Sequence, residues 1–312
     1  MRVFLTGATG YIGGTVAQSL LAAGHQVIGL ARSDEAAERL TAVGVMAHRG
    51  DLKDLESLKS GATSAEGVIH TGFSVDDWGK LDVAFAQERA AVEAMLDTLK
   101  GTGKPFLYTS GAGVFAETGN RVVDETASPD AKEDVGLRIP IEQTVVQAAE
   151  HNIRTIVIRP GLVYGNGGSQ IMYAIAGLVR QAGGTHTVGD GQNAWSAVHV
   201  EDLADLYLKA IENGPAGTVF HAASEDKASM HDIASAIART LNLQGPATVW
   251  PVEEAKGALG PLAEGLASNK RISAAKAREV LGWRPQRIGL IDDIENGSYP
   301  AAFGVTGGRA GG

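Results

Sequence analysis

Thr6-Gly7-Ala8-Thr9-Gly10-Tyr11-Ile12-Gly13-Gly14 follows the apolar run Val3-Phe4-Leu5 and decides the fold of this chain. A strand that passes through closely spaced glycines into a helix is typical of a dinucleotide-binding site. The glycines let the backbone turn tightly and approach a pyrophosphate, which then lies against the free N–H groups and the positive dipole end of the helix. We therefore predict that a dinucleotide is held here by Gly7, Thr9, Gly10, Tyr11 and Ile12.

The residues after this stretch complete a strand–helix–strand unit. Residues 13–23 carry apolar side chains at helical spacing, Gly24 stands where a helix would stop, and residues 26–30 resume as a strand. A unit of this length around the glycines is the expected context of a dinucleotide site. It disfavours the alternative in which the glycines only shape a surface turn.

The end of the second strand indicates which nicotinamide cofactor binds. An enzyme that holds the ribose of NAD usually places Asp or Glu there, whereas this strand is followed by Arg32 and Ser33. A guanidinium is a planar, permanently charged fork suited to phosphate oxygens, and a serine adds a hydroxyl donor. The sequence thus favours NADP(H) over NAD(H). The alternative is that Arg32 only pairs with Asp34 or Glu35 at the surface.

Alternating strand and helix patterns continue to about residue 160 and predict an α/β fold with a Rossmann-type, doubly wound parallel sheet. Expected strands are Val45 to His48, Gly67 to His70, Pro105 to Thr109 and Arg154 to Arg159, and expected long helices are Lys80 to Lys100 and Ile139 to Glu150. We assign residues 1–165 to the dinucleotide-binding domain, with 195–221 returning to it. Residues 166–194 and 222–303 then form a smaller C-terminal substrate lobe, and 304–312 a disordered tail.

Composition excludes several classes of function. The 312 residues have a formal net charge of -9, which disfavours nucleic acid and anionic membrane surfaces as partners. No cysteine is present, so disulfides, thiolate ligands and cysteine nucleophiles are excluded. The scattered histidines have no metal-ligand spacing, and we expect no metal site. With no secretory segment or membrane span in the sequence, we expect a cytoplasmic protein.

Several later segments extend the pattern begun by the spacing Gly7-x-x-Gly10-x-x-Gly13. They are Gly50-Asp51-Leu52, Val68-Ile69-His70-Thr71-Gly72, Arg159-Pro160-Gly161-Leu162-Val163-Tyr164-Gly165, Ser196 to Ala204 and Leu281-Gly282-Trp283-Arg284-Pro285. In this order the segments resemble the short-chain dehydrogenase/reductase superfamily, in its extended or atypical branch of NAD-dependent epimerases and dehydratases. The resemblance implies further cofactor contacts from Asp51, Leu52, Thr71, Gly72, Thr109, Pro160, Gly161 and Val163. For Asp51 the alternative is a capping role on the helix that follows.

The proton-transfer pair of that superfamily is absent. Its members use Tyr-x-x-x-Lys, in which the lysine charge lowers the phenol pKa, and none of the six tyrosines here has lysine four residues later. The resemblance does supply Ser110 for orienting the substrate oxygen. An ungapped alignment through Glu142-Gln143 places Asp134 at the tyrosine and Arg138 at the lysine. Arg138 is the candidate for electrostatic support, and a surface role is favoured for Asp134.

Three explanations of the missing pair stay open. A group of the second lobe or of a loop beside the cofactor supplies the proton, with Tyr164, Tyr173 and His186 as the available side chains. Alternatively, solvent supplies the proton while Ser110 and Arg138 polarise the substrate. Finally, the chain binds NADP(H) without turnover, as a sensor.

The expected substrate contacts are mostly small or apolar and favour a small, apolar or aromatic carbonyl or imine compound as hydride acceptor. The resemblance implies that they are Phe73, Ser74, Gly111, Tyr164, Tyr173, His186 and Trp195. The rival reading is a nucleotide-sugar epimerase or dehydratase with bound NAD, for which Arg180, Lys270 and Arg271 are the nearest cations for a diphosphate. The resemblance also suggests a homodimer formed through the two long helices.

Overall fold

A seven-stranded parallel sheet forms the larger part of the molecule, in the computed structural model that describes residues 1–74, 80–131, 136–224 and 228–305. The strand order is β11-β6-β5-β4-β1-β2-β3. The first strand therefore lies in the middle of the sheet, and the strand order reverses between β1 and β4, which run parallel to each other. The strands are β1 (Arg2–Thr6), β2 (Gln26–Ala31), β3 (Met46–Arg49), β4 (Gly67–His70), β5 (Pro105–Thr109), β6 (Arg154–Pro160) and β11 (Thr218–Ala222). The predicted Rossmann-type fold is confirmed.

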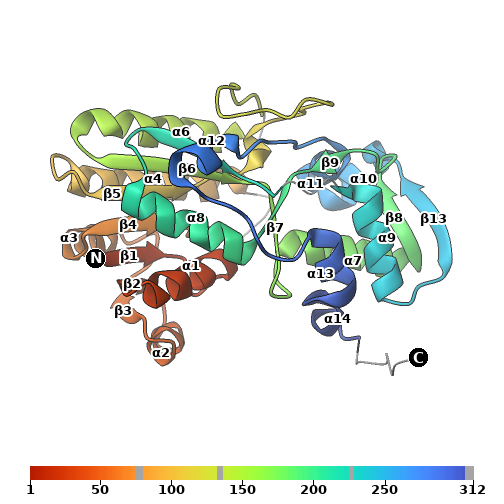
Figure 1. The fold of residues 1–312 in the computed structure, drawn as a ribbon, viewed down its shortest axis with the longest axis horizontal. Coiled ribbons are helices and arrows are strands. Elements are labelled where there is room, and N and C mark those ends of the chain that lie inside the picture. Colours follow the sequence, from red (N-terminus) through yellow and green to blue (C-terminus); the bar gives the residue numbers. More distant parts are fainter. Residues whose placement is uncertain (75–79, 132–135, 225–227, 306–312) are drawn as a thin grey trace.

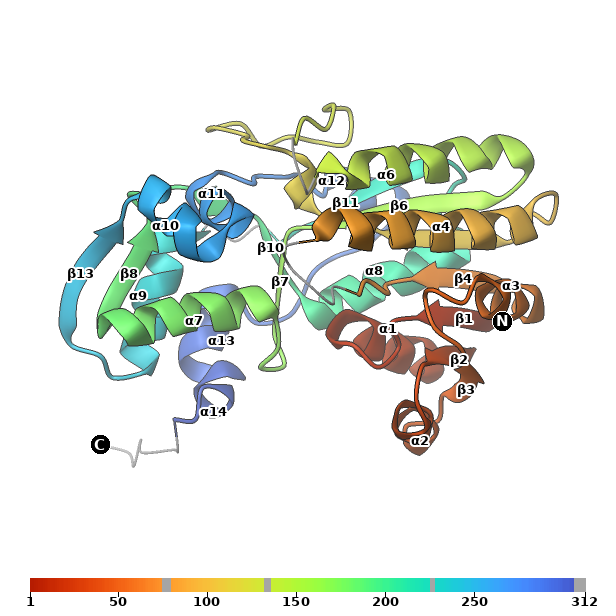
Figure 2. The same cartoon turned by 180° about the vertical axis from the view of Figure 1, so that it is seen from behind.

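Helices cover both faces of this sheet. Figure 1 shows α1 (Tyr11–Ala22) and α8 (Val200–Asn213) side by side on one face. Figure 2 shows α4 (Leu81–Leu99) beside α6 (Arg138–Gln147) on the other, where α3 (Leu55–Ser64) also packs. The helix α2 (Asp34–Ala42) packs against β2 and β3.

Alternation along the strands explains why both faces are buried. In β5, Leu107 packs with the core under α1 and α8, whereas Phe106 and Tyr108 pack with the core under α3, α4 and α6. Successive strand residues point to opposite faces, and the near-continuous apolar runs of these strands therefore supply two cores at once.

A second lobe holds a third apolar core. Both figures show it at the end of the molecule opposite the N-terminus. Its elements are α7 (Gln170–Ala182), β8 (Gly184–Val188), α9 (Met230–Thr240), β13 (Gly245–Trp250), α10 (Val252–Leu259), α11 (Pro261–Ala267), α13 (Leu290–Asn296) and α14 (Tyr299–Ala302). Short strand pairs link the lobes: β7 (Leu162–Tyr164) with β10 (Ala197–His199), and β9 (Ala194–Trp195) with β12 (Ala228–Ser229).

One segment packs with a different core from the one that the expected domain boundaries give it. The stretch from Ile272 to Trp283, which includes α12 (Ala275–Leu281), was expected in the C-terminal lobe but joins the core under α1 and α8. The Trp283 indole Nε1 donates to the Asp202 carbonyl at 2.8 Å, which ties this stretch to the start of α8. Within the described ranges, no helix is long and apolar enough to cross a membrane.

Candidate active site

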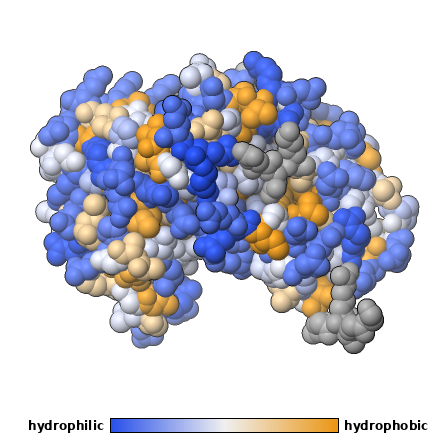
Figure 3. All heavy atoms as spheres, viewed as in Figure 1, coloured by the Kyte–Doolittle hydropathy of each residue, from blue (hydrophilic) through white to orange (hydrophobic). Residues whose placement is uncertain are grey.

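A cleft of about 2020 Å³ follows the carboxyl ends of the sheet strands and continues onto the second lobe. Its lining begins at the start of α2, passes the glycine stretch after β1 and the ends of β4, β5 and β6, and reaches α10 and α11. In the space-filling view the outline is notched between the two lobes (Figure 3). Parallel α/β sheets bind ligands at this edge, where the strand order reverses.

The backbone of the glycine stretch turns so tightly that two of its positions, Gly7 and Gly13, have no room for a side chain; we call this turn the glycine cradle. Gly7 has a left-handed φ of 74°, and the Gly10 N–H donates to its carbonyl at 2.9 Å. A Cβ on Gly13 would lie 2.2 Å from that same carbonyl oxygen. No side chain of the described residues caps the start of α1, so the N–H groups of its first turn remain available to a phosphate. All five residues predicted here line the cleft: Gly7, Thr9, Gly10, Tyr11 and Ile12.

At the far end of β2 the cleft is lined by two arginines. Arg32 was predicted from the sequence. Arg39, in the last turn of α2, was not. Neither makes an ion pair with another residue of the described ranges, and Asp34 pairs with Arg49 at 2.9 Å instead. The Ser33 hydroxyl caps α2 by accepting from the Ala36 N–H at 3.1 Å, which leaves its proton to donate.

Asp51 and Leu52 line the same end of the cleft. Asp51 does not cap the next helix, because Asp54 does so by accepting from the Ser57 N–H at 3.1 Å. One Asp51 oxygen accepts from the Lys53 N–H at 2.9 Å and fixes the turn. The capping explanation of Asp51 is therefore wrong.

The predicted contacts after β4 and β6 also line the cleft: Thr71, Gly72, Pro160, Gly161 and Val163. Thr109 is not among the described lining residues. Its Oγ1 lies 2.5 Å from the Tyr207 hydroxyl, because the alternation of β5 points Thr109 toward α8. The residue thus supports the wall behind the cleft.

Ser110 stands directly after β5 and lines the cleft. Its Oγ is buried and has no hydrogen-bond partner among the described residues. Phe73, Ser74, Gly111 and Trp195 line the cleft as predicted for substrate contacts. An unpartnered buried hydroxyl is costly, and a ligand oxygen bound beside Ser110 would satisfy it.

Arg138 occupies a different place from the one predicted. Its guanidinium lies 4.9 Å from the Phe73 ring centre and 5.2 Å from that of Phe85, behind the described lining of the cleft. From there it approaches Glu88, with 3.5 Å between Nη2 and Oε2. Arg138 therefore reaches the cleft through Glu88 rather than directly.

Glu88 is a further lining residue that was not predicted from the sequence. It lies on α4 with a side chain only 3% exposed, in the apolar stripe formed by Ala84, Phe85, Ala91 and Met95. A carboxylate at this position of a helical apolar stripe was the available signal. Burial raises the pKa of Glu88, and the opposing effects of Arg138 and Tyr108 are smaller.

The three groups proposed as proton donors in the second lobe lie elsewhere. The Tyr164 hydroxyl donates to the Ile288 carbonyl at 2.8 Å within the lobe core. The Tyr173 hydroxyl donates to the Gly167 carbonyl on the outside of α7, and His186 pairs with Thr248 between β8 and β13. None of the three is among the described residues lining the cleft. Asp134 lies outside the described residues.

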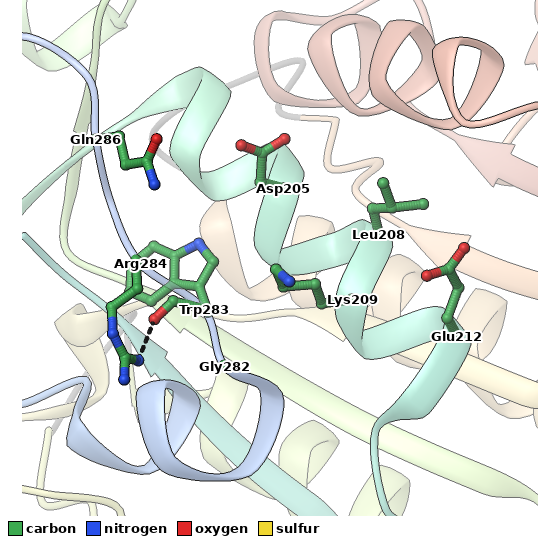
Figure 4. A pocket seen from close by; sticks show the side chains of 8 residues that line it. All are labelled: Asp205, Leu208, Lys209, Glu212, Gly282, Trp283, Arg284 and Gln286. Carbon is green, nitrogen blue, oxygen red and sulfur yellow. Dashed lines mark hydrogen bonds between the residues drawn. The ribbon is translucent and has the colours of Figure 1, made fainter.

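A second, smaller hollow of about 320 Å³ lies between α8 and the chain after α12 (Figure 4). Acidic and basic side chains both line it (Asp205, Glu212, Lys209 and Arg284), and the Arg284 guanidinium donates back to the Trp283 carbonyl at 2.8 Å. Gly282, which ends α12 with a left-handed φ of 60°, lines the hollow, and no helix begins among its described lining residues. In the described part of the chain, no three His, Asp or Glu side chains gather as metal ligands.

The sequence pattern of the NAD dependent epimerase/dehydratase family matches residues 3–223. An uncharacterized protein of Saccharomyces cerevisiae is 39% identical over 297 residues, which cover 94% of this chain and 98% of that protein. The 2-alkyl-3-oxoalkanoate reductase of Stenotrophomonas maltophilia is 26% identical, over 68% of this chain and 66% of the reductase. The crystal structure of Thermus thermophilus UDP-glucose 4-epimerase with NAD has a TM-score of 0.77 at 19% identity, over 98% of this chain and 100% of the epimerase.

Proposed function

Because this chain belongs to the NAD-dependent epimerase/dehydratase family, we propose that it is an NADP-dependent oxidoreductase that reduces a small, apolar or aromatic carbonyl or imine compound. One observation carries the proposal: one cleft is lined by the glycine cradle, by two arginines at the end of β2 and by Ser110, whose hydroxyl has no partner among the described residues. NADPH bound along this cleft would supply the hydride. The reductase among the relatives supports the reaction class.

The substrate end of the cleft supports an apolar compound over a sugar nucleotide. Its lining on α10 and α11 includes Ala258, Leu259, Pro261 and Leu262. Of the three cations named for a diphosphate, Lys270 is among the described lining residues and the other two are not, and all three donate to backbone carbonyls. Arg180 donates to the Phe303 carbonyl, Lys270 to the carbonyls of Phe115 and Ala116, and Arg271 to the carbonyl of Asn120.

The direct test is consumption of NADPH across a panel of ketones, aldehydes and imines. We expect turnover of at least one apolar or aromatic member. Tight NADPH binding with no turnover of any member would favour the sensor function, and conversion of a nucleotide sugar with bound NAD would favour the epimerase.

Replacing Arg32 with aspartate is expected to weaken NADPH binding relative to NADH by about 10- to 100-fold. The change removes one charged donor to the phosphate, worth about 1.5–3 kcal/mol, and adds a repelling carboxylate. Fluorescence titration of both cofactors measures the ratio. The matched control is Arg89→Asp on α4, whose exposed side chain pairs with Glu93; an unchanged ratio in Arg32→Asp contradicts the phosphate role.

Replacing Ser110 with alanine is expected to lower kcat by about 10- to 100-fold without changing the Kd of NADPH. The hydroxyl would orient the reacting oxygen, and removing one such donor weakens the transition state more than the ground state. Steady-state kinetics with the best substrate of the panel measures the effect. Ser64→Ala, at the end of α3, is the control, and equal kcat in Ser110→Ala and Ser64→Ala contradicts the assignment.

A further inference from the structure

Glu88 and Ser110 reach the cleft from the same face of the sheet. In a strand, residues two apart point to the same side, and Ser110 continues the β5 ladder through its N–H bond to the Ile158 carbonyl at 2.8 Å. Tyr108, two residues earlier, packs with the core under α4 and α6. Its hydroxyl donates to Glu88 Oε1 at 3.0 Å. Tyr108 thus fixes the Glu88 carboxyl on the side of β5 where Ser110 opens into the cleft.

Glu88 Oε1 accepts from the Tyr108 hydroxyl at 3.0 Å, and Oε2 accepts from Arg138 Nη2 at the longer distance of 3.5 Å, so Oε2 is the less strongly bonded oxygen. Because the Tyr108 hydroxyl donates to Oε1, a proton on the carboxyl would be on Oε2. The Arg138 guanidinium is 3.5 Å from Oε2, at the limit of a hydrogen bond, and lies against the rings of Phe73 and Phe85. Those aromatic faces stabilise the guanidinium charge, so Arg138 does not depend on an ionised Glu88 for all of its stabilisation.

Burial of Glu88 favours its protonated form, whereas the charged and polar groups that face it favour the ionised form. Among the described residues, Arg138 on α6 and Tyr108 on β5 face it, and His70 on β4 lies behind Tyr108 with the two rings nearly parallel. His70 is fully buried, and burial together with Arg138 lowers its pKa to about 3, so it stays neutral. Burial raises the Glu88 pKa despite the opposing effects of Arg138 and Tyr108.

We propose that Glu88 is the acid that protonates the reacting oxygen, in place of the absent Tyr-x-x-x-Lys pair; the proposal rests on the reductase function above. The carbonyl carbon accepts hydride while NADPH is oxidised to NADP⁺, and the carbonyl π pair moves to the oxygen held by Ser110. The Oε2–H bond of Glu88 breaks as the new O–H bond forms. The resulting carboxylate is stabilised by Arg138 and Tyr108 and regains its proton from water in the cleft. Arg138 is then a positioning residue.

The first experiment tests the protonation state of Glu88 without substrate or cofactor. Infrared difference spectra near neutral pH should show the carbonyl stretch of a buried protonated carboxyl in the wild type and its loss in Glu88→Gln. The matched control is Glu93→Gln on the same helix, whose side chain is 45% exposed and pairs with Arg89. This control should keep the band. A wild-type spectrum without the band contradicts the proposal.

The second experiment tests the transfer step with the best carbonyl substrate of the panel. Glu88→Gln preserves the shape and the Tyr108 hydrogen bond but carries no acid proton, so kcat should fall about a hundredfold. The Kd of NADPH should stay within about twofold, which shows that the variant is folded. Glu93→Gln should retain full kcat.

The pH dependence gives a readout that loss of structure would not imitate. Protonated Glu88 is the active form, so wild-type kcat/KM should fall as pH rises through the raised pKa of Glu88, and this fall should disappear in Glu88→Gln. Glu88→Asp, which keeps an acid proton on a shorter side chain, should recover part of kcat and the fall with pH. Equal kcat in the wild type and Glu88→Gln overturns the Glu88 proposal alone. A wild type that binds NADPH but reduces no carbonyl or imine overturns the reductase function and the Glu88 role together.

Discussion

Replacing Glu142 with glutamine is expected to lower the free energy of unfolding by about 3–5 kcal/mol. Glu142 on α6 and Arg159 on β6 form a buried ion pair, with side chains 4% and 6% exposed. The Arg159 Nε donates to Oε2 at 3.0 Å and Nη2 donates to the same oxygen. In the glutamine variant the Arg159 charge stays buried without its counter-charge, and the new amide N–H₂ faces donors. Urea denaturation followed by circular dichroism measures the loss.

Two further variants separate the charge from the packing. Replacing both partners, Glu142→Leu with Arg159→Met, removes the buried charges together and keeps similar volume, so stability should return to within about 1 kcal/mol of the wild type. The exposed ion pair of Arg89 and Glu93 contributes little, and Glu93→Gln should change stability by less than about 0.5 kcal/mol. A double variant as unstable as Glu142→Gln would show that the loss comes from packing.

The fold was predictable because its signals are local. The strand expected at Gly67 to His70 has those bounds as β4, and the helix expected at Lys80 to Lys100 is α4, Leu81–Leu99. Apolar periodicity and the positions of glycines are read from residues close together in the sequence, and they suffice to locate the strands and helices of this sheet. The glycine cradle was predictable for the same reason, because Gly7 and Gly13, which approach each other closely, lie near each other in the sequence.

The chemical end of the site was harder to predict because it depends on contacts between distant segments. Glu88 matters through Tyr108 and Arg138, which lie 20 and 50 residues away in sequence. Arg138 has the positive charge expected at the position of the missing lysine, but its guanidinium packs on the rings of Phe73 and Phe85 behind the cleft. Tyr164 and His186 have suitable side chains, yet the strand pairs β7–β10 and β8–β13 hold them away from the cleft.

Replacing Gly13 with alanine is expected to weaken NADPH binding at least a hundredfold. The new Cβ would lie 2.2 Å from the Gly7 carbonyl oxygen and 2.6 Å from Thr71 Oγ1. No real contact is that short, and the Gly7 carbonyl is backbone, so the turn itself must shift. That carbonyl also accepts from the Gly10 N–H, which means that the shift displaces the residues proposed to hold the pyrophosphate. Overpacking should also destabilise the fold by about 1–3 kcal/mol.

The adjacent Gly14→Ala variant provides the matched control, with the opposite sign. A Cβ on Gly14 would meet only the Ala8 carbonyl oxygen, at an ordinary 3.5 Å. Gly14 lies within α1, where alanine is favoured over glycine by up to about 1 kcal/mol, so this variant should be slightly more stable than the wild type and bind NADPH normally. Fluorescence titration and thermal unfolding of both variants measure the two effects. If Gly13→Ala bound NADPH as tightly as Gly14→Ala, close packing of α1 on the Gly7 turn would not be what shapes the cofactor site. Weak NADPH binding in Gly13→Ala alone would show that the cofactor site needs glycine at residue 13 in particular, because the two variants add the same methyl group to the same turn of helix.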